Sequence, residues 1–333
     1  MADLYDLIII GAGPCGLACG IEAHKASLRY LIVEQGSIAE SIRRYPVHMR
    51  FFSTADNISI GGIPFAIADA KANRSEALQY YRKVSEYFQL HIRLYTRIER
   101  IELQGDSFVL HTHRGEQLHS RAVVVATGYF TRPRLLQVEG EDLPHVSHYY
   151  KEPFEYVHQR VVIIGGGNSA VEAALDLYRH GAKVHMLVRG QDFKPTAKYW
   201  LVPDLKRRIA EGHIQASFGC QVQRITPTIV EYTQQGQVHR LPADFVLALT
   251  GYLPDDSLLR QAGVKVDNEL VPQHNEHFET NVKGLYVAGT AICGIHTEKV
   301  YIENGRLHAP VIIKHLSRRL QNESTIGTQR SAH

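Results

Sequence analysis

Cysteine, tryptophan and long apolar runs are all scarce in this sequence. Its 333 residues include four cysteines and one tryptophan, and Cys15, Cys19, Cys220 and Cys293 form no CxxC pair and no Cys/His spacing typical of zinc. We therefore expect neither a disulfide framework nor a metal site. No stretch reaches the ~18 consecutive apolar residues of a membrane span. The first residues lack the charged region and cleavage site of a signal peptide, so we expect a soluble, cytoplasmic protein.

A strong charge of one sign is also missing. The 37 basic and 34 acidic side chains give a net charge of +3 and a pI of about 8.6. Binding to nucleic acid or to a membrane surface needs basic residues gathered on one face, and the longest basic run, over 206–208, lies in a helical pattern. We expect neither partner. The length predicts about two domains.

The first half of the chain begins as a strand, a glycine loop and a helix. An apolar strand over 5–10 runs into Gly11-Ala12-Gly13-Pro14-Cys15-Gly16, a helix follows to about residue 26, and a second strand over 30–33 ends at Glu34. An amphipathic helix with Leu78, Tyr81, Val84 and Phe88 on one stripe comes next. Three alternating segments, near 92–103, 107–112 and 118–125, lead to Ala126-Thr127-Gly128.

The second half repeats this order. A strand over 161–164 leads into Gly165-Gly166-Gly167-Asn168-Ser169-Ala170 and a helix to about residue 180, and a second strand over 183–188 ends at Arg189. A helix over about 198–211 follows, and later an apolar strand ends at Thr250-Gly251. The repetition predicts an α/β protein with two Rossmann-like, three-layer domains.

Each glycine loop follows an apolar strand and opens a helix, which is the context of a dinucleotide site. The first glycine permits the tight turn, the second lets the backbone approach a pyrophosphate, and the third position packs the helix on the strand. Glu34 can accept hydrogen bonds from a ribose 2′ hydroxyl and would repel a 2′ phosphate. Arg189, with Lys194 nearby, has the opposite preference. The second loop therefore predicts an NADPH site.

The first loop is then best interpreted as an FAD site. Two nicotinamide sites could only exchange hydride between nicotinamides, whereas NADPH paired with FAD can deliver two electrons to other acceptors. The predicted FAD site consists of Gly11, Gly13, Pro14, Cys15, Gly16, Glu34, Gln35, Phe52, Ala126, Thr127, Gly128, Gly289 and Thr290. The predicted NADPH site consists of Gly165, Gly167, Asn168, Ser169, Ala170, Arg189, Lys194, Thr250 and Gly251.

On these motifs the sequence is similar to the thioredoxin-reductase-like flavoproteins along nearly the whole chain. Its 280–290 segment looks like the late strand that returns to the first domain in that group, where Asp usually stands in place of Thr290. The resemblance implies an NADPH domain inserted into a discontinuous FAD domain. We expect a first FAD part at 1–130, the NADPH domain at 131–255, and a second FAD part at 256–333 with a C-terminal helix that contacts the flavin.

Four further stretches, together with the Pro14-Cys15-Gly16 start of the first helix, narrow the resemblance to the YpdA-type bacillithiol disulfide reductases. They are Phe51-Phe52-Ser53-Thr54, Ile60-Gly61-Gly62-Ile63-Pro64-Phe65, His148-Tyr149-Tyr150-Lys151-Glu152-Pro153-Phe154 and Lys198-Tyr199-Trp200. The resemblance implies that the acceptor is a small-molecule disulfide, bacillithiol disulfide or a close relative, and that the protein forms a homo-oligomer.

Thioredoxin reductases carry a CxxC pair just before the second glycine loop, and this chain has no cysteine at 145–149. The electrons must therefore pass directly from the flavin or through a single thiol. In the family that the sequence resembles, the suspected thiol corresponds to Cys15. A helix N-terminus at this position favours the thiolate and can lower the thiol pKa from ~8.5 to about 7 or below, whereas the FAD pyrophosphate would oppose the shift. A redox role and a packing role for Cys15 both remain open.

Disulfide reduction also needs protons, and His296 and His308 are candidates to supply them. A structural role is the favoured interpretation of both histidines, whereas Phe51 and Phe52 could either pack on the flavin or fill the core. Three other functions stay open. They are a ferredoxin or flavodoxin-NADP reductase, a flavin monooxygenase and a non-enzymatic redox sensor that binds FAD and NADPH.

Overall fold

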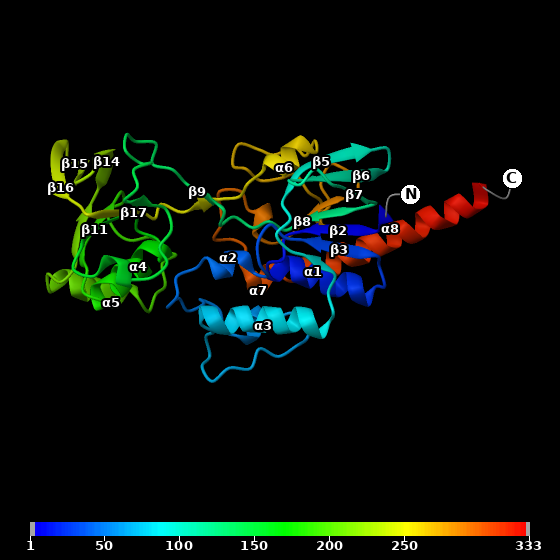
Figure 1. Cartoon of the computed structure of the whole chain (residues 1–333), viewed down its shortest axis with the longest axis horizontal. Helices are drawn as coiled ribbons and strands as arrows, with labels where there is room; N and C mark the ends of the chain where they lie inside the picture. The colour runs from blue at the N-terminus through cyan, green and yellow to red at the C-terminus, as the bar shows by residue number, and fades with distance from the viewer. Residues whose placement is uncertain (1–3, 331–333) are drawn as a thin grey trace. The chain divides into compact units, whose positions relative to one another are not determined.

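The computed structural model describes the backbone of residues 4–330 and the side chains of residues 4–323. The chain divides into two compact units. Unit 1 takes in the chain up to Arg44, then Ser53–Arg132, and the chain from Leu253 onward, whereas unit 2 consists of Tyr45–Phe52 and Pro133–Tyr252. Most of unit 2 is therefore inserted, in chain order, within unit 1 (Figure 1).

A five-stranded parallel sheet forms the centre of unit 1, in the order β19-β8-β2-β3-β4. Its strands are rich in Val, Ile and Leu because helix and sheet layers cover both faces, which leaves no strand face for polar residues. All four residues of β2 are buried. The bounds are β2 (Leu7–Ile10), β3 (Tyr30–Val33), β4 (Ile92–Arg93), β8 (Val123–Val125) and β19 (Leu285–Val287).

Two layers cover this sheet. On one side α1 (Pro14–Lys25) packs against β2 and β3 and against α8 (His308–Arg330). On the other, Ile8, Val33 and Val125 share a core cluster with Ile101 and Phe108 of a second sheet. That sheet has the order β1-β7-β6-β5, with β1 (Leu4–Tyr5), β5 (Ile98–Gln104), β6 (Ser107–Thr112) and β7 (Gln117–Ser120).

Shorter elements complete unit 1. The helix α3 (Arg74–Tyr87) begins at a capping box, in which the Asn73 side chain accepts from the Glu76 amide and the Glu76 carboxylate accepts from the Asn73 amide. This arrangement satisfies two amides that the first turn leaves without partners. The other helices are α2 (Glu40–Arg43), η1 (Asp56–Ile58), α6 (Ser257–Gln261), η3 (Gly289–Ile292) and α7 (Ile302–Gly305).

Unit 2 has the same plan. Its parallel sheet, β10-β17-β11-β12-β13, carries helices on one face and the antiparallel sheet β14-β15-β16 on the other. The strands are β10 (Val146–Ser147), β11 (Arg160–Ile164), β12 (Lys183–Val188), β13 (Gln215–Phe218), β14 (Cys220–Ile225), β15 (Ile229–Gln234), β16 (Gln237–Pro242) and β17 (Phe245–Ala248). The helices are η2 (Phe154–Tyr156), α4 (Asn168–Arg179) and α5 (Val202–Ala210), and β9 (Arg132–Pro133) pairs with β18 (Tyr252–Leu253).

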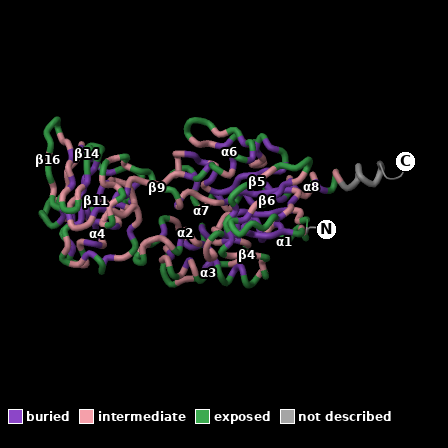
Figure 2. The backbone as a smooth tube through the Cα atoms, turned by 45° about the horizontal axis from the view of Figure 1, so that its top comes forward, coloured by how far each residue is buried: buried purple, intermediate pink, exposed green. Residues whose placement is uncertain are grey.

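Burial follows the layers. The parallel strands β2 and β11 are buried along nearly their whole length, whereas β16 is exposed or half-buried (Figure 2). Among the described residues, no helix combines the length and the hydropathy that crossing a bilayer requires.

The predicted α/β fold with two Rossmann-like units is confirmed. The strands predicted over 30–33 and 183–188 have those bounds. Three predicted segments are instead divided between two sheets. Residues 5–10 split into β1 and β2, 92–103 into β4 and β5, and 118–125 into β7 and β8, because the chain crosses from one layer to the other within each segment.

The helix predicted over 198–211 begins later than expected, at Val202. Residues before it form a turn, in which the Leu201 amide donates to the Lys198 carbonyl at 2.9 Å. The Lys198 amide in turn donates to Asn168 Oδ1 at 2.7 Å, which fixes this turn on the start of α4. Pro203 lies in the first turn of α5, where its missing N–H costs no helical hydrogen bond.

Candidate dinucleotide-binding sites

The first glycine loop joins β2 to α1 and has the shape that a pyrophosphate requires. Gly11 has φ +112°, and a Cβ there would lie 2.5 Å from the Ala126 carbonyl oxygen. A Cβ on Gly16 would lie 1.9 Å from the Gly11 oxygen, so α1 approaches the strand as closely as a glycine permits. A Cβ on Gly13 would meet no atom within 4 Å. The loop is therefore tight at its two ends and open at its middle glycine, where a phosphate can approach the backbone.

Glu34, at the end of β3, turns its carboxylate toward this loop. Its Oε2 accepts from the Ala12 amide at 2.7 Å and its Oε1 from the Gly36 amide at 2.8 Å. Burial raises the pKa of the Glu34 carboxyl, while these backbone hydrogen bonds act in the opposite direction. Each carboxylate oxygen keeps a further lone pair, which can accept from a ribose hydroxyl.

Segments far apart in sequence meet at the start of α1. A Cβ on Gly289, in η3, would lie 2.8 Å from Cys15 Sγ, and a Cβ on Gly128 would lie 3.6 Å from Thr290 Oγ1. The structure thus gathers Ala126–Gly128, Gly289, Thr290 and Cys15 beside the loop. We call these residues, with Gly11, Gly13, Gly16 and Glu34, the first dinucleotide site.

Burial acts on the pKa of Cys15 in the direction opposite to the start of α1. Burial raises the pKa of the Cys15 thiol to about 12, and the nearby Cys293 adds to the rise. The thiol packs against the backbone of Gly289 and Gly305, whose added Cβ atoms would lie 2.8 and 2.9 Å from Sγ. Desolvation of the thiolate therefore opposes the effect of the helix N-terminus here, and a redox role for Cys15 stays a prediction.

The two histidines considered for proton delivery have different surroundings. His308 is buried at the start of α8, where its Nδ1 accepts from the Gly289 amide at 3.2 Å and its ring stacks on Phe278 with centroids 4.0 Å apart. Burial lowers the pKa of His308 to about 4, so its ring is neutral at pH 7. His296 is partly exposed, with Nε2 3.0 Å from Glu269 and Nδ1 3.7 Å from Glu298.

Three residues predicted for the FAD site, Pro14, Gln35 and Phe52, are not part of the first dinucleotide site as defined above. Pro14 is the first residue of α1, where its fixed φ suits a helix start. Gln35 is exposed next to Glu34. Phe52 belongs to unit 2, where its ring is 5.3 Å from that of Trp200 and 6.4 Å from that of Tyr199. A flavin contact for Phe52 stays a prediction.

The second glycine loop, between β11 and α4, repeats the first. Gly165 has φ +144°, and a Cβ there would lie 2.3 Å from the Leu249 carbonyl oxygen and 3.4 Å from the Ala170 Cβ. A Cβ on Gly167 would meet only Lys194 Cδ, at 3.6 Å. This loop too is tight at its ends and open at its middle position, and a lysine side chain lies over the opening.

Two cations border the second loop. Lys194 is exposed, and its backbone amide donates to the Gly166 oxygen at 2.8 Å, which holds it beside the loop. Arg189 directly follows β12, the strand next to β11, and is also exposed. Among the described residues neither side chain forms an ion pair. Both charges remain available to a phosphate, and a 2′ phosphate is the group that Arg at this place in the fold accepts.

The other predicted residues of the second site form hydrogen bonds with neighbouring loops or pack in α4. The Asn168 side chain donates to the Thr196 carbonyl at 3.2 Å as well as accepting from Lys198. Ser169 is half-buried and Ala170 is buried in α4. The Thr250 hydroxyl donates to the Arg134 carbonyl oxygen, and the Arg134 amide donates to the Gly251 carbonyl at 2.9 Å.

Both loops lie at the position where α/β sheets bind ligands. In unit 1, β3 and β8 flank β2 on opposite sides, and in unit 2, β12 and β17 flank β11 in the same way. The chain connections leave the central strand in opposite directions, which opens a crevice at its carboxyl end. The two loops follow these carboxyl ends, so each unit fits one dinucleotide.

These features define a class of two-dinucleotide oxidoreductases, and the chain belongs to the pyridine nucleotide-disulphide oxidoreductase family, whose sequence profile matches residues 8–289. The chain is 37% identical over 316 residues to bacilliredoxin reductase Bdr of Bacillus subtilis, and this alignment covers 94% of this chain and 97% of that protein. Bacillithiol disulfide reductase Bdr (YpdA) from Bacillus cereus has the same fold, with a TM-score of 0.93, 37% identity, and coverage of 95% of this chain and 100% of that one.

The corresponding structure from Staphylococcus aureus superimposes with a TM-score of 0.92 at 36% identity, over 96% of this chain and 99% of that one. The chain is an NADPH-dependent flavin oxidoreductase, and its cofactors are FAD and NADPH. The first site, with its carboxylate, suits the unphosphorylated ribose of FAD, and the second, with its two cations, suits NADPH.

Sequence reasoning missed some neighbours of these sites. The packing of Gly305 on Cys15 joins residues from opposite ends of the chain, and no local pattern signals it. The contact of His308 with Gly289 is of the same kind. The position of Lys194 was predicted, because it follows Arg189 by five residues.

Proposed function

We propose that this protein reduces a low-molecular-weight disulfide with electrons from NADPH, and that the disulfide is that of bacillithiol. The observation that carries the proposal is the likeness over nearly the full chain to proteins named bacillithiol disulfide reductase, together with a sequence that has no CxxC pair to serve a dithiol relay. The balanced reaction converts NADPH, one proton and one disulfide into NADP⁺ and two thiols.

The residues of the first site orient the flavin and control charge around it. FAD, when bound, accepts two electrons as hydride and passes them to the acceptor. Gly13 and the amides that begin α1 hold its pyrophosphate, and Glu34 accepts from its ribose. Arg189 and Lys194 hold the 2′ phosphate of NADPH in the second site.

Cys15 is the candidate redox thiol. A thiolate at Cys15 would attack the substrate disulfide, form a mixed disulfide and release one thiol, and two further electrons would then release the second. The raised pKa sets a condition for this route, because a neutral thiol is a weak nucleophile. The holoenzyme has to lower that pKa, or the disulfide is reduced directly with Cys15 as a packing residue.

We assign the proton-supplying role to His296 rather than to His308. His296 is partly exposed and lies between Glu269 and Glu298, with Nε2 3.0 Å from the first carboxylate and Nδ1 3.7 Å from the second, so its ring can exchange protons with solvent. His308, with a pKa of about 4, carries no proton to donate from Nδ1 at pH 7. A His296→Gln variant should lower turnover with the disulfide and leave reduction of the flavin by NADPH unchanged.

The test is a steady-state assay of NADPH oxidation by the FAD-loaded protein with bacillithiol disulfide as acceptor. We expect turnover with this disulfide well above that with oxidised glutathione, in the wild type and in the matched Cys19→Ala variant. Loss of turnover in Cys15→Ala supports the single-thiol route, whereas full turnover assigns Cys15 to packing and leaves the reductase proposal intact. A wild type that oxidises NADPH no faster with bacillithiol disulfide than without it would contradict the proposal.

A protein acceptor is the second candidate, since the Bacillus subtilis relative is named for bacilliredoxin. The same assay with oxidised bacilliredoxin as acceptor, and with no bacillithiol present, separates the two. Turnover with the protein alone would replace the small disulfide by bacilliredoxin as the direct substrate.

Ferredoxin reduction is the other alternative. The ferredoxin–NADP reductase of Ignicoccus hospitalis is 23% identical over 293 residues, covering 86% of this chain and 90% of that protein, so this likeness is much weaker. Rapid oxidation of the reduced enzyme by ferredoxin and not by the disulfide would favour it. We further propose that the enzyme is cytoplasmic, because the cytoplasm supplies both NADPH and small thiols. We also propose that it is a homo-oligomer, as the resemblance to its family implies.

A further inference from the structure

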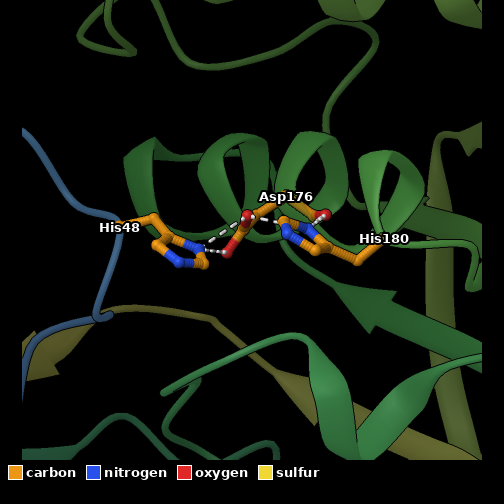
Figure 3. Close-up of side chains that lie close together, drawn as sticks. All are labelled: His48, Asp176 and His180. Carbon is orange, nitrogen blue, oxygen red and sulfur yellow. Dashed lines mark hydrogen bonds and ion pairs between the residues drawn. The ribbon is translucent and has the colours of Figure 1, made fainter.

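Two histidines and an aspartate gather in unit 2, away from its glycine loop. His48 belongs to the segment 45–52, and Asp176 and His180 lie at the end of α4. His48 Nδ1 is 3.2 Å and His180 Nδ1 is 3.3 Å from Asp176 Oδ1, and the two rings point toward the carboxylate from opposite sides (Figure 3). Among the described residues, no other group of three such side chains comes this close together.

We propose that His48, Asp176 and His180 form a binding site for a divalent transition-metal ion of the Zn²⁺ class. The three ligand atoms lie within 4.8 Å of one another. For a tetrahedral ion with ligands at about 2.05 Å, neighbouring ligand atoms are about 3.3 Å apart. The two distances to Asp176 Oδ1 already match that spacing, and the two rings are nearly parallel with centroids 5.4 Å apart.

The donor set selects the metal. Two imidazole nitrogens and one carboxylate oxygen suit Zn²⁺, Co²⁺, Ni²⁺ or Cu²⁺, whereas Ca²⁺ and Mg²⁺ require oxygen ligands. Three protein ligands leave the fourth position to water, as in open zinc sites. The His48 side chain is 50% exposed, which gives an ion access from solvent.

A second layer of contacts orients the aspartate. Tyr150, which is buried, donates from its hydroxyl to Asp176 Oδ2 at 2.6 Å and thereby fixes the orientation of the carboxylate, both of whose oxygens lie within 3.3 Å of His48 Nδ1. His180 Nδ1 also lies 2.8 Å from the Asp176 backbone oxygen, and coordination would replace this contact. Phe154 packs edge-on against the His180 ring, with centroids 5.2 Å apart, and limits how that ring can turn.

The site would join two parts of unit 2 that are distant in sequence. The Val47 amide donates to the Lys151 carbonyl at 2.8 Å and the Lys198 ammonium donates to the Arg50 carbonyl at 2.6 Å, so one backbone and one side-chain hydrogen bond hold the chain on either side of His48. A metal ion held by His48 and α4 adds a third, stronger attachment. The predicted effect is slower exchange of the 45–52 backbone amides.

The test uses the full-length, FAD-loaded protein after treatment with a chelator. Titration with Co²⁺ should produce the visible bands of tetrahedral coordination at one ion per chain, and Zn²⁺ should displace them. His48→Ala and His180→Ala should each abolish the bands, and Tyr150→Phe should weaken binding about tenfold, as loss of a partner outside the ligand shell does. Zn²⁺ should slow hydrogen exchange in residues 45–52 of the wild type and not of His48→Ala.

The matched control is His213→Ala. His213 is 51% exposed and lies 3.6 Å from Glu211, so it has the exposure and the carboxylate of His48 without a second imidazole. This variant should bind Co²⁺ as the wild type does. Equal titration curves for the wild type and for a His48→Ala/His180→Ala double variant, both folded by circular dichroism, would overturn the proposal.

Discussion

The His308 imidazole is neutral because the protein encloses it. Its Nδ1 accepts from the Gly289 amide, so the proton of the neutral ring is on Nε2, and protonation of Nδ1 would break this hydrogen bond inside the first dinucleotide site. Burial is the main cause of the lowered pKa, and the nearby His274 adds to it. The residue thus supports the backbone that carries Thr290, and its protonation state affects stability.

This gives a prediction for pH. The unfolded chain takes up a proton at His308 near pH 6.5, whereas the folded chain does so only at about pH 4, so protons favour unfolding between these values. We expect His308 to cost the wild type about 1 kcal/mol of stability on going from about pH 7.5 to about pH 5.5. Urea unfolding of the wild type and of His308→Gln at both pH values measures it. The variant should lose less stability in acid, and an equal loss in both proteins would contradict the assignment.

Arg189 gives a second prediction about a single residue. Replacing it by Glu puts a carboxylate where the 2′ phosphate is expected, so repulsion replaces a charge-assisted contact. The preference for NADPH over NADH, measured as a ratio of kcat/KM values, should fall by about tenfold to a hundredfold. Lys183→Glu, at the opposite end of β12, is the control and should leave the ratio unchanged. An unaltered ratio in Arg189→Glu would mean that Lys194 or another group recognises the phosphate.

The positions of residues beside the glycine loops could be predicted from sequence where they depend on neighbours along the chain. Glu34 and Lys194 each lie within one βαβ unit of their glycine loop, and the structure places both beside it. The pKa of Cys15 could not be predicted, because it depends on Gly289 and Gly305, which lie nearly three hundred residues away. The partners of His48 were hidden for the same reason.

At the scale of elements, the short helix α7 shows how closely the first site is packed. A Cβ on its last residue, Gly305, would lie 2.9 Å from Cys15 Sγ and 3.1 Å from Gly289 Cα and Val300 Cγ1. The helix can approach α1 and η3 only because this position has no side chain. The glycine therefore sets the distance between these three elements.

We expect Gly305→Ala to destabilise the protein by about 1–3 kcal/mol through overpacking. Cys15→Ala removes the sulfur that the new methyl group would meet, so the double variant should recover about 1 kcal/mol relative to the sum of the single changes. Thermal unfolding in excess FAD, on the wild type, both single variants and the double variant, gives the coupling. Strictly additive effects would show that the new methyl group is accommodated elsewhere.

Element types were predictable because their signals are local. Strands buried on both faces give runs of Val, Ile and Leu, and the strands at 30–33 and 183–188 were predicted to the residue. The assignment of a strand to a sheet was not predictable. The sequence over 118–125 predicts one strand, whereas the structure divides it into β7 and β8, which belong to different sheets. The start of α5 was missed because a turn fixed on Asn168 replaces its expected first turn.

At the scale of the whole molecule, we expect each of the two units, which share one plan, to bind one of the two cofactors. A ligand that binds only the folded state stabilises it by about 2.7 kcal/mol at a hundred times its Kd. We expect NADP⁺ to slow hydrogen exchange in unit 2, in peptides over 160–170 and 187–198, and removal of FAD to speed exchange in unit 1, in peptides over 7–16 and 285–292. Mass spectrometry of the exchanged peptides measures both effects.

NAD⁺ at the same concentration is the control for this experiment, and it should protect unit 2 less than NADP⁺ does. Protection of the first glycine loop by NADP⁺, with none at the second, would reverse the assignment of the two sites.

The duplicated plan was predictable, because each half begins with a strand, a glycine loop and a helix. The membership of 45–52 in unit 2 was not, because that segment is joined to it by contacts such as Val47 with Lys151 that leave no periodic pattern.

The place of β19 in the sheet has a consequence for biosynthesis. The outer neighbour of β8 begins at Leu285, so a ribosome makes the whole of the inserted unit before it supplies the strand that pairs with β8. Throughout that interval the outer edge of β8 presents unpaired backbone groups, which other nascent chains can pair with. If translation stops after unit 2 is complete, the outer edge of β8 stays unpaired permanently. We expect quality-control proteases to remove such truncated chains.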